Sequence, residues 1–157
     1  MKHYLSIFTI LCLLLGIAAC SSEPVFDTTP EIEFLEITPT EIQQLTGEFT
    51  VSIRFQDGDG DLGNNNSENT NLYVADTRTV FDTLEPSGFS ILNLTPDTKN
   101  PSIQGTISIQ VPAPPLTRFL TGIGPLEELT TFRIWMVDRA GNISNEIFTT
   151  PVLITND

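Results

Sequence analysis

A strict two-residue alternation of apolar and polar side chains constrains the fold of this chain more than any other feature. From Phe49 to Gln56, apolar residues occupy every second position and polar residues occupy the positions between them. The segment 103–111 alternates in the same way. Successive side chains of a β-strand point to opposite faces, so these segments predict strands with one buried and one solvated face. The chain is therefore expected to belong to the all-β class.

Further apolar segments, separated by prolines and glycines, indicate more short strands. We predict strands at 31–38, 48–56, 71–76, 78–84, 88–94, 102–111, 130–138 and 144–154. Helical periodicity never lasts three turns, so at most a turn or two of helix is expected, within 40–45 and 116–129. Short strands with regular turn signals in a chain of this size favour an antiparallel β-sandwich.

Two residues of these predicted strands carry more specific expectations. Gly105 occupies one of the inward positions of its strand, which indicates a β-bulge. Trp135 lies in a strand that is apolar on both faces, and we expect its side chain in the core.

The N-terminal segment has a different character. Lys2 precedes a nearly continuous apolar stretch over residues 4–17, and two alanines connect that stretch to Cys20. An apolar segment this short is typical of a cleaved signal peptide rather than of a membrane-spanning helix. Residues 17–20, Ile-Ala-Ala-Cys, resemble the lipobox of bacterial lipoproteins. The resemblance implies cleavage before Cys20, a diacylglyceryl group on its thiol and acylation of the new N-terminus.

These features divide the chain into three parts. Residues 1–19 are expected to be a signal peptide, residues 20–30 a lipidated tether, and residues 31–157 a single domain. Ser21 occupies the position at which Asp retains enterobacterial lipoproteins in the inner membrane. The outer membrane is therefore favoured, with the leaflet undetermined. The alternatives are an ordinary signal peptide with an unrelated cysteine, and an uncleaved N-terminal anchor.

The charge balance is strongly acidic. Lys2 leaves with the signal peptide, so six of the seven basic residues face all twenty acidic ones, a net charge of −14 in the mature chain. Binding to nucleic-acid phosphates requires clustered Lys and Arg, so nucleic acid is not an expected partner. Anionic lipid also repels such a chain, and attachment to the membrane must come from the lipid on Cys20. Divalent cations are the natural counter-charge.

Cleavage of the signal peptide also limits the available chemistry. His3 is the only histidine, and Cys12 is the only cysteine apart from Cys20; both lie within the signal peptide. The mature domain then has no imidazole and no free thiol. This excludes disulfides, His- or Cys-ligated metals, and Ser-His-Asp or Cys-His catalysis. Carboxylate chemistry and a hard, oxygen-preferring metal ion remain.

The acidic segment 57–68 joins two predicted strands. Asp57, Asp59 and Asp61 alternate with flexible residues, and carboxylates this close repel one another unless a cation lies among them. Calcium takes about six to eight oxygen ligands, and Glu68 falls on the twelfth place of the EF-hand spacing. The sixth place is leucine and the flanks are strands, which argues against a true EF-hand. We predict a calcium loop of another type; the alternative is a solvated turn.

The segment 132–145 carries a second resemblance. Its sequence is FRIWMVDRAGNISN, in which a strand ends in a D-x-A-G-N-x-S turn. It resembles the last hairpin of bacterial immunoglobulin-like and fibronectin-III-like domains. Together with the lipobox and the acidic loop, it resembles small lipoproteins of the Bacteroidetes.

The immunoglobulin-like topology implies which loops lie together. With strands B, C, E and F at 48–56, 71–76, 102–111 and 130–138, the B–C and F–G loops share one end of the domain. Asp138 and Asn142 would then approach the acidic loop and join its carboxylates as metal ligands. Asp97 and Asn100 could reach the same end. The alternative is that Asp138 and Asn142 only cap their own hairpin.

We therefore expect a non-enzymatic lipoprotein whose calcium-stiffened domain binds an envelope protein or a surface glycan. The loop-rich end away from the tether is expected to make the contact. Phe119 is expected to be exposed, within a long segment at 113–128 of the kind that often carries binding. The alternative is a carbohydrate-active or carbohydrate-binding protein that uses acidic loop residues as acid and base. A purely structural spacer is the third hypothesis.

Overall fold

The computed structural model describes residues 26–64, 66, 68–81, 84–92, 94 and 102–156. The predicted signal peptide, Cys20 and the first half of the predicted tether lie outside these residues. Within the described part of the chain, no helix is long and apolar enough to cross a membrane.

The described residues are all-β, as predicted: the strands pair mostly antiparallel, and almost no helix is present. The first sheet has the order β1-β3-β6, formed by β1 (Glu31–Thr38), β3 (Glu48–Asp57) and β6 (Ile103–Pro112). The second has the order β5-β4-β8-β9, formed by β5 (Ser87–Phe89), β4 (Leu72–Asp76), β8 (Phe132–Met136) and β9 (Ile147–Phe148).

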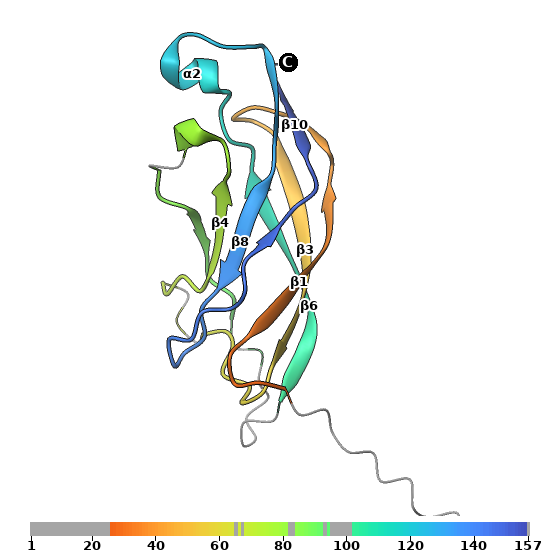
Figure 1. Cartoon of the computed structure of the whole chain (residues 1–157), viewed down its shortest axis with the longest axis vertical. Coiled ribbons are helices and arrows are strands. Elements are labelled where there is room, and N and C mark those ends of the chain that lie inside the picture. Colours follow the sequence, from red (N-terminus) through yellow and green to blue (C-terminus); the bar gives the residue numbers. More distant parts are fainter. Residues whose placement is uncertain are drawn as a thin grey trace, which may run out of the picture.

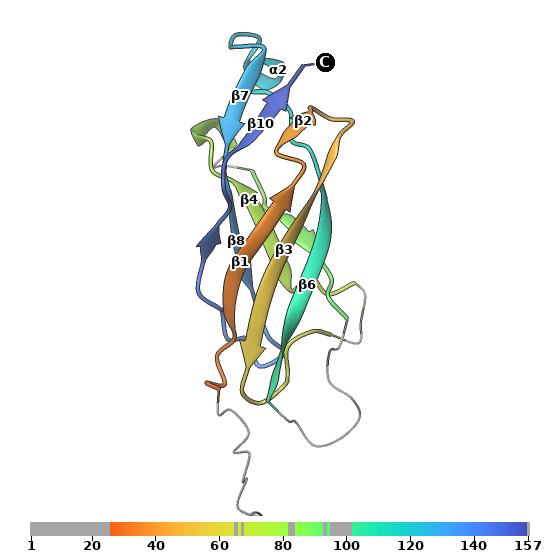
Figure 2. The ribbon, with the colours of Figure 1, turned by 90° about the vertical axis from the view of Figure 1, so that its right-hand side faces the viewer.

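A third, smaller sheet closes one end of the molecule. It contains β2 (Glu41–Gln43), β10 (Val152–Thr155) and β7 (Glu127–Thr130), in which β10 runs parallel to β2 and antiparallel to β7. The short helix α2 (Thr117–Thr121) lies at the same end, next to the C-terminus, whereas the described chain enters at the opposite end (Figures 1 and 2).

The two larger sheets face each other and enclose the core (Figure 1). Phe49, Val51 and Ile53 of β3 are almost completely buried, and they belong to the same cluster as Ile134 of β8. Phe49 also stacks on Phe132 of β8, with ring centroids 4.6 Å apart and an interplanar angle of 29°. The apolar half of the sequence alternation therefore supplies the interior of the domain.

The expected bulge at Gly105 is wrong. Phe55 pairs with Gly105 in an unbroken register between β3 and β6. A Cβ atom on Gly105 would lie 3.0 Å from the Phe55 ring, so glycine makes room for an aromatic neighbour rather than for an extra residue. The register shift lies in β1 instead, between Phe34 and Glu36.

The expected burial of Trp135 in the core is also wrong. Its neighbours Ile134 and Met136 take the inward positions of β8, so Trp135 lies on the outer face of the four-stranded sheet. There its ring stacks on Tyr73 of β4, with centroids 5.3 Å apart and an interplanar angle of 8°. The guanidinium carbon of Arg133 lies 5.0 Å from the centre of the Trp135 ring.

Some predicted elements take another form. The expected helical turn at 40–45 is the strand β2, which is held by pairing with β10 from the other end of the chain. The expected strand at 78–84 contains a 3-10 turn, η1 (Thr79–Phe81), followed by two residues outside the described part. The expected strand at 144–154 is divided into β9 and β10.

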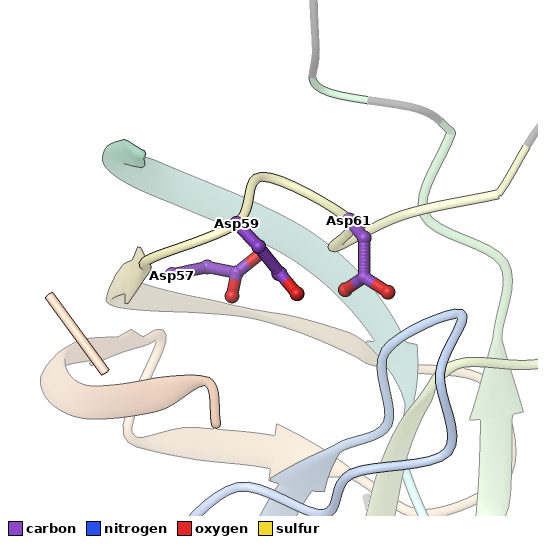
Figure 3. A group of neighbouring side chains, drawn as sticks. All are labelled: Asp57, Asp59 and Asp61. Atoms are coloured by element: carbon purple, nitrogen blue, oxygen red, sulfur yellow. The ribbon is translucent and has the colours of Figure 1, made fainter. Parts of the chain in front are cut away.

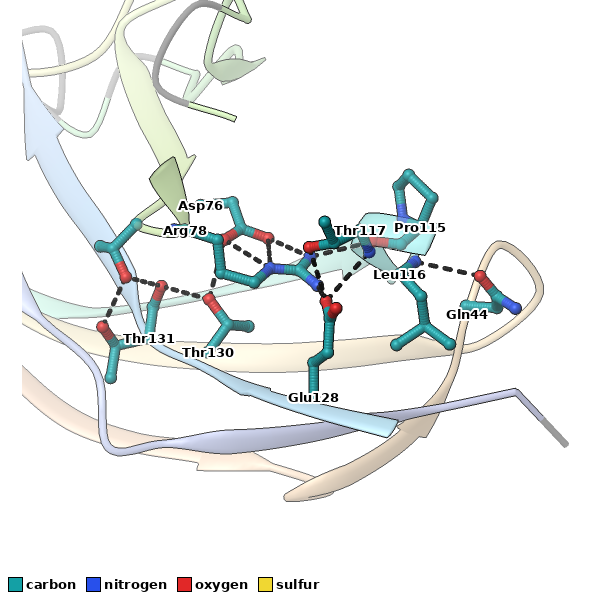
Figure 4. Close-up of polar contacts among 10 residues, drawn as sticks. Gln44, Asp76, Arg78, Pro115, Leu116, Thr117, Glu128, Thr130 and Thr131 are labelled. Atoms are coloured by element: carbon teal, nitrogen blue, oxygen red, sulfur yellow. Dashed lines mark hydrogen bonds and ion pairs between the residues drawn. The ribbon is translucent and has the colours of Figure 1, made fainter. Parts of the chain in front are cut away.

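A buried ionic network fixes the end that carries α2 (Figure 4). The guanidinium of Arg78 pairs with Asp76 at the end of β4 and with Glu128 of β7, and it also donates to the carbonyl oxygen of Pro115 at 3.0 Å. The Glu128 carboxylate accepts bonds from the backbone N–H and the hydroxyl of Thr117 at 3.0 and 2.9 Å. The network therefore joins the second sheet, the small sheet and the start of α2.

The pKa of Glu128 reflects this network. Burial acts to raise the pKa of this carboxyl, but the hydrogen bonds from Thr117 and the charge of Arg78 outweigh burial and lower it. A carboxyl whose pKa is lower in the folded state stabilises the fold above its unfolded-state pKa. That stabilisation disappears as the pH falls through the folded-state pKa.

Replacement of Glu128 with Gln should therefore destabilise the domain in a pH-dependent way. At pH 7 we expect a loss of about 1–3 kcal/mol in the free energy of unfolding, because Arg78 and Thr117 lose a charged acceptor. The loss should be smaller at pH 3, because this pH lies below the unfolded-state pKa of glutamate and part of the stabilisation by the charged carboxylate is already lost there. Urea unfolding at both pH values measures this effect. The exposed neighbour Glu127, changed to Gln, is the matched control, and an equal loss in both variants would contradict the prediction.

Candidate metal centre

The acidic loop begins where β3 ends. Asp57 is the last residue of β3 and pairs with Ile103 of β6, after which the chain turns away from the first sheet. Gly60 has a φ of 67°, in the left-handed region that favours glycine, and permits the tight curl of the loop. Leu62 is fully buried in the apolar core and draws the loop inward. A core contact therefore holds the acidic residues close to the body of the domain.

The three aspartates of this loop converge (Figure 3). Each of Asp57, Asp59 and Asp61 offers one carboxylate oxygen, and these three oxygens lie within 4.8 Å of one another. Asp57 is 0% exposed and Asp61 is 9% exposed. The Oδ1 atoms of all three are buried and have no hydrogen-bond partner among the described residues. Buried carboxylate oxygens without a partner are costly, because burial removes the water that would otherwise stabilise their charge.

Backbone N–H groups hold the other oxygen of two of these carboxylates. Leu62 donates its N–H to Oδ2 of Asp57 at 2.9 Å, and Ala140 donates its N–H to Oδ2 of Asp61 at 3.0 Å. Asp57 and Asp61 each have one oxygen fixed by the backbone and one left for another ligand. This arrangement suits a cation that binds a single oxygen from each carboxylate.

The electrostatics of the group reflect unbalanced negative charge. Burial raises the pKa of Asp57, and repulsion from Asp59 and Asp138 adds to the increase, against the opposing bond from Leu62. Burial also raises the pKa of Asp61, with repulsion from Asp138, Asp59 and Asp57 adding to it. A cation among these oxygens would remove both effects, because it replaces the lost hydration and screens the repulsion.

The loop between β8 and β9 closes over the acidic loop, as the resemblance implied. The Arg139 guanidinium donates to the carbonyl oxygens of Gly63 and Gly60 at 3.3 and 3.4 Å. Asp138 is buried, and its charge helps to raise the pKa of Asp57 and of Asp61. Its two carboxylate oxygens accept bonds from the N–H and the side-chain amide of Asn142 at 2.7 and 2.8 Å. The Asp138–Asn142 pair thus caps its own hairpin while it borders the acidic group.

Glu68, the sixth predicted ligand, lies apart from the group. Glu68 is exposed and is not part of the converging group. Its N–H instead bonds to the Asn66 side chain at 3.0 Å, in a turn typical of solvated loops. Asp97 and Asn100 lie outside the described residues. The structure therefore brings together three of the six predicted ligands and places Asp138 and Asn142 beside them.

The acidic loop lies at the end of the domain where residues 26–30 enter. The partner contact was expected at a loop-rich end away from the predicted tether, and the acidic loop does not lie at that end. The antiparallel register places Glu31, at the start of β1, opposite Gln56, at the end of β3. The segment before β1 therefore meets the loop after β3 (Figures 1 and 2).

Three contributions escaped the sequence analysis. The burial of Leu62 had a visible signal, because it is the only large apolar residue within 57–68. The N–H of Ala140 and the side chain of Arg139 had none, because a backbone donor and a lone surface arginine have no sequence pattern of their own. All three position the carboxylates or the loop that holds them.

The donor set determines the chemistry that this group can perform. It offers carboxylate oxygens without nitrogen or sulfur, which suits a hard cation such as calcium. A small hollow of about 60 Å³ borders Gly63 and Asp138, and none of the three aspartates lines it.

Comparison of the chain with protein-family models, with curated proteins and with solved structures finds no match. The function of this chain therefore has to follow from its own residues and geometry.

Removal of one charge from the group should stabilise the domain when no metal ion is present. In chelator, we expect Asp59→Asn to raise the free energy of unfolding by about 1 kcal/mol, because one of three converging charges is lost. Glu68→Gln makes the same change in charge on an exposed residue of the same loop and should have little effect. Urea unfolding in EGTA measures both variants. Equal stabilities would show that the aspartates do not repel one another in the folded domain.

Proposed function

We propose that this chain is a lipid-anchored envelope protein whose calcium-stiffened, immunoglobulin-like domain acts as a non-enzymatic binding module. One observation carries the proposal: three carboxylates converge, with one oxygen of each within 4.8 Å of the others, and each of the three has a buried Oδ1 atom without a hydrogen-bond partner among the described residues. A positive partner among the oxygens stabilises a group of this kind at neutral pH, because it replaces the lost hydration and balances the charge.

Calcium is the ion that this arrangement favours. It accepts six to eight oxygens at about 2.3–2.6 Å in flexible geometries, so loop carbonyls and water can complete a set of three carboxylates. Magnesium demands a near-ideal octahedron with shorter bonds and gives up its water reluctantly. Calcium would join the acidic loop to the hairpin that donates the Ala140 N–H.

The strand order supports an immunoglobulin-like assignment. With β1, β3 and β6 as strands A, B and E, the facing sheet β5-β4-β8-β9 corresponds to C′, C, F and G. Phe49 and Phe132 then stack between strands B and F, where antibody domains carry their inter-sheet disulfide. The D-x-A-G-N-x-S turn falls between strands F and G, as in the domains it resembles.

The lipid anchor rests on the lipobox resemblance at residues 17–20. Lipidation of Cys20 would tether the domain by the end that carries the acidic loop, because residues 26–30 enter there. Ser21, in place of the Asp that retains enterobacterial lipoproteins in the inner membrane, favours the outer membrane. Several acyl chains together make such attachment effectively stable.

A non-enzymatic role agrees with the geometry of the carboxylates. Glycosidases hold their two carboxyl groups about 5–5.5 Å or 6.5–9.5 Å apart on either side of a sugar. Here one oxygen of each of the three aspartates lies within 4.8 Å of the other two. A substrate has no room between these groups, whereas an ion does.

The opposite end of the domain offers a surface for a protein partner. Around α2 and β7 it exposes five large apolar side chains, namely Phe119, Leu120, Ile123, Leu126 and Leu129. The ten residues of β3 separate this end from the acidic loop by roughly 30 Å. Exposed apolar groups of this size often mark contacts with other proteins, so an envelope protein is the partner that we propose.

A surface glycan is the second candidate ligand, and one observation favours it. Tyr73 and Trp135 place stacked rings on the outer face of the second sheet, together with Arg133. Aromatic rings and polar side chains on an open sheet face are suited to sugar rings. This surface is separate from the acidic loop, so a glycan would be bound rather than cleaved there.

Calcium titration of the full mature chain tests the proposed function. We expect calorimetry to detect binding after chelation, and calcium to raise the melting temperature more than magnesium at the same concentration. Asp59→Asn should weaken calcium binding at least about tenfold, or about 1.4 kcal/mol, whereas Glu68→Gln should leave it nearly unchanged. If calcium gives no heat and no shift in melting temperature, the loop is only a solvated turn.

Replacement of Cys20 tests the lipid anchor separately. In cells that express the full chain, we expect the parent protein in the detergent phase of a Triton X-114 partition. Cys20→Ala should move to the aqueous phase, because it has no thiol for the diacylglyceryl group. Cys12→Ala, within the predicted signal peptide, is the matched control. A Cys20→Ala variant that stays in the detergent phase would argue for an uncleaved N-terminal anchor.

A further inference from the structure

The last residues before β1 lie directly against the acidic loop. The N–H of Gly58, between Asp57 and Asp59, donates to the carbonyl oxygen of Asp27 at 2.7 Å. Phe26 is half-buried and Pro30 is almost fully buried, so the entering chain packs on the domain before the first strand begins. In Figure 3 this segment, in pale orange, passes beside Asp57.

The contact at Gly58 is backbone against backbone and leaves no space. A Cβ atom at this position would lie 2.3 Å from the carbonyl oxygen of Phe26 and 2.6 Å from that of Asp27. Both atoms belong to the main chain, so no side-chain rotation could relieve the clash. Glycine at position 58 therefore permits a contact that any other residue would break.

The two neighbours of Gly58 carry the converging oxygens. Asp57 and Asp59 contribute two of the three unpartnered Oδ1 atoms, and the Gly58 N–H that meets the entering chain lies between them. Without a cation, repulsion between these groups favours a more open loop, which would move the Gly58 N–H away from Asp27. With a cation, the loop is fixed in the conformation that presents this N–H.

We propose that calcium in the Asp57–Asp59–Asp61 group locks residues 26–29 onto the domain and thereby sets how the domain is held at its anchor. The inference rests on the calcium site proposed above and adds the regulation of that site. With calcium bound, the chain leaves the domain in one fixed direction. Without calcium, residues 26–29 are released from the domain and lengthen the reach of its attachment by up to about 13 Å.

The coupling is reciprocal. If calcium favours docking of residues 26–29, docking of these residues strengthens calcium binding by the same factor. The docked contact includes one backbone hydrogen bond and the packing of Phe26, so we expect a factor of roughly five.

The first experiment uses the full mature chain in detergent micelles. Backbone ¹⁵N relaxation of Phe26, Asp27, Thr28 and Thr29 reports their mobility in saturating calcium and in EGTA. We expect these four amides to be as rigid as the β-strands in calcium and mobile in EGTA. Ile32, whose N–H and C=O both bond to the Asn145 side chain at 2.8 Å, should stay rigid in both and is the internal control.

The second experiment blocks the contact with Gly58→Ala. The added Cβ should displace residues 26–29, so they remain mobile even in saturating calcium, and calcium affinity falls roughly fivefold. Gly122→Ala is the matched control. Gly122 follows α2, at the opposite end of the domain from the acidic loop. Its φ of 76° makes alanine strained there, but an added Cβ atom would meet no other atom within 4 Å. This variant should bind calcium as the parent chain does.

The outcomes separate the two proposals. If calcium binds but residues 26–29 have the same mobility in calcium and in EGTA, the coupling is wrong and the calcium site stands. If Gly58→Ala binds calcium with unchanged affinity, or if its residues 26–29 stay rigid, the coupling is also wrong. If the parent chain binds no calcium, both proposals fail together. Relaxation of the parent chain decides the matter even if Gly58→Ala does not fold.

Discussion

Repulsion among three carboxylates at the end of β3 is the constraint around which this end of the molecule is organised. Leu62 holds the loop down from the core side, the Ala140 N–H and the Arg139 guanidinium hold it from the neighbouring hairpin, and Gly58 meets the entering chain. These contacts hold the three negative charges close together, at a cost in electrostatic repulsion. A cation that neutralised the charges would remove this cost, and the same contacts would then hold the acidic loop, the β8–β9 hairpin and the entering chain together.

The two ends of the domain are stabilised by different means. At the end with α2, Arg78 supplies the positive charge internally, and the carboxylates of Asp76 and Glu128 are satisfied by the protein itself. At the acidic end, by contrast, Asp57, Asp59 and Asp61 each keep a buried Oδ1 atom without a hydrogen-bond partner among the described residues. If calcium binds there as we propose, this end of the domain responds to the calcium concentration, whereas the Arg78 network does not depend on it.

Local pattern predicted the strands that form the core, because residues such as Val51 and Ile53 show their buried face by alternation alone. It failed where a distant partner decides the conformation. β2 becomes a strand only because β10 pairs with it, and Trp135 lies outward because Ile134 and Met136 already fill the inner face. For the site, spacing identified the three aspartates, and resemblance indicated the neighbouring hairpin. The contact between Gly58 and Asp27 depends on the register of β1 with β3, which no local pattern reveals.

The stacked rings of Phe49 and Phe132 join the two sheets without a disulfide, so folding of the domain does not depend on the redox conditions around it. The contact joins the two sheets by van der Waals attraction and excluded water, neither of which depends on an electron acceptor. Folding then needs no thiol oxidase or disulfide isomerase, and glutathione or other reductants leave the domain intact. A domain built in this way reaches the same structure in oxidising and in anoxic surroundings.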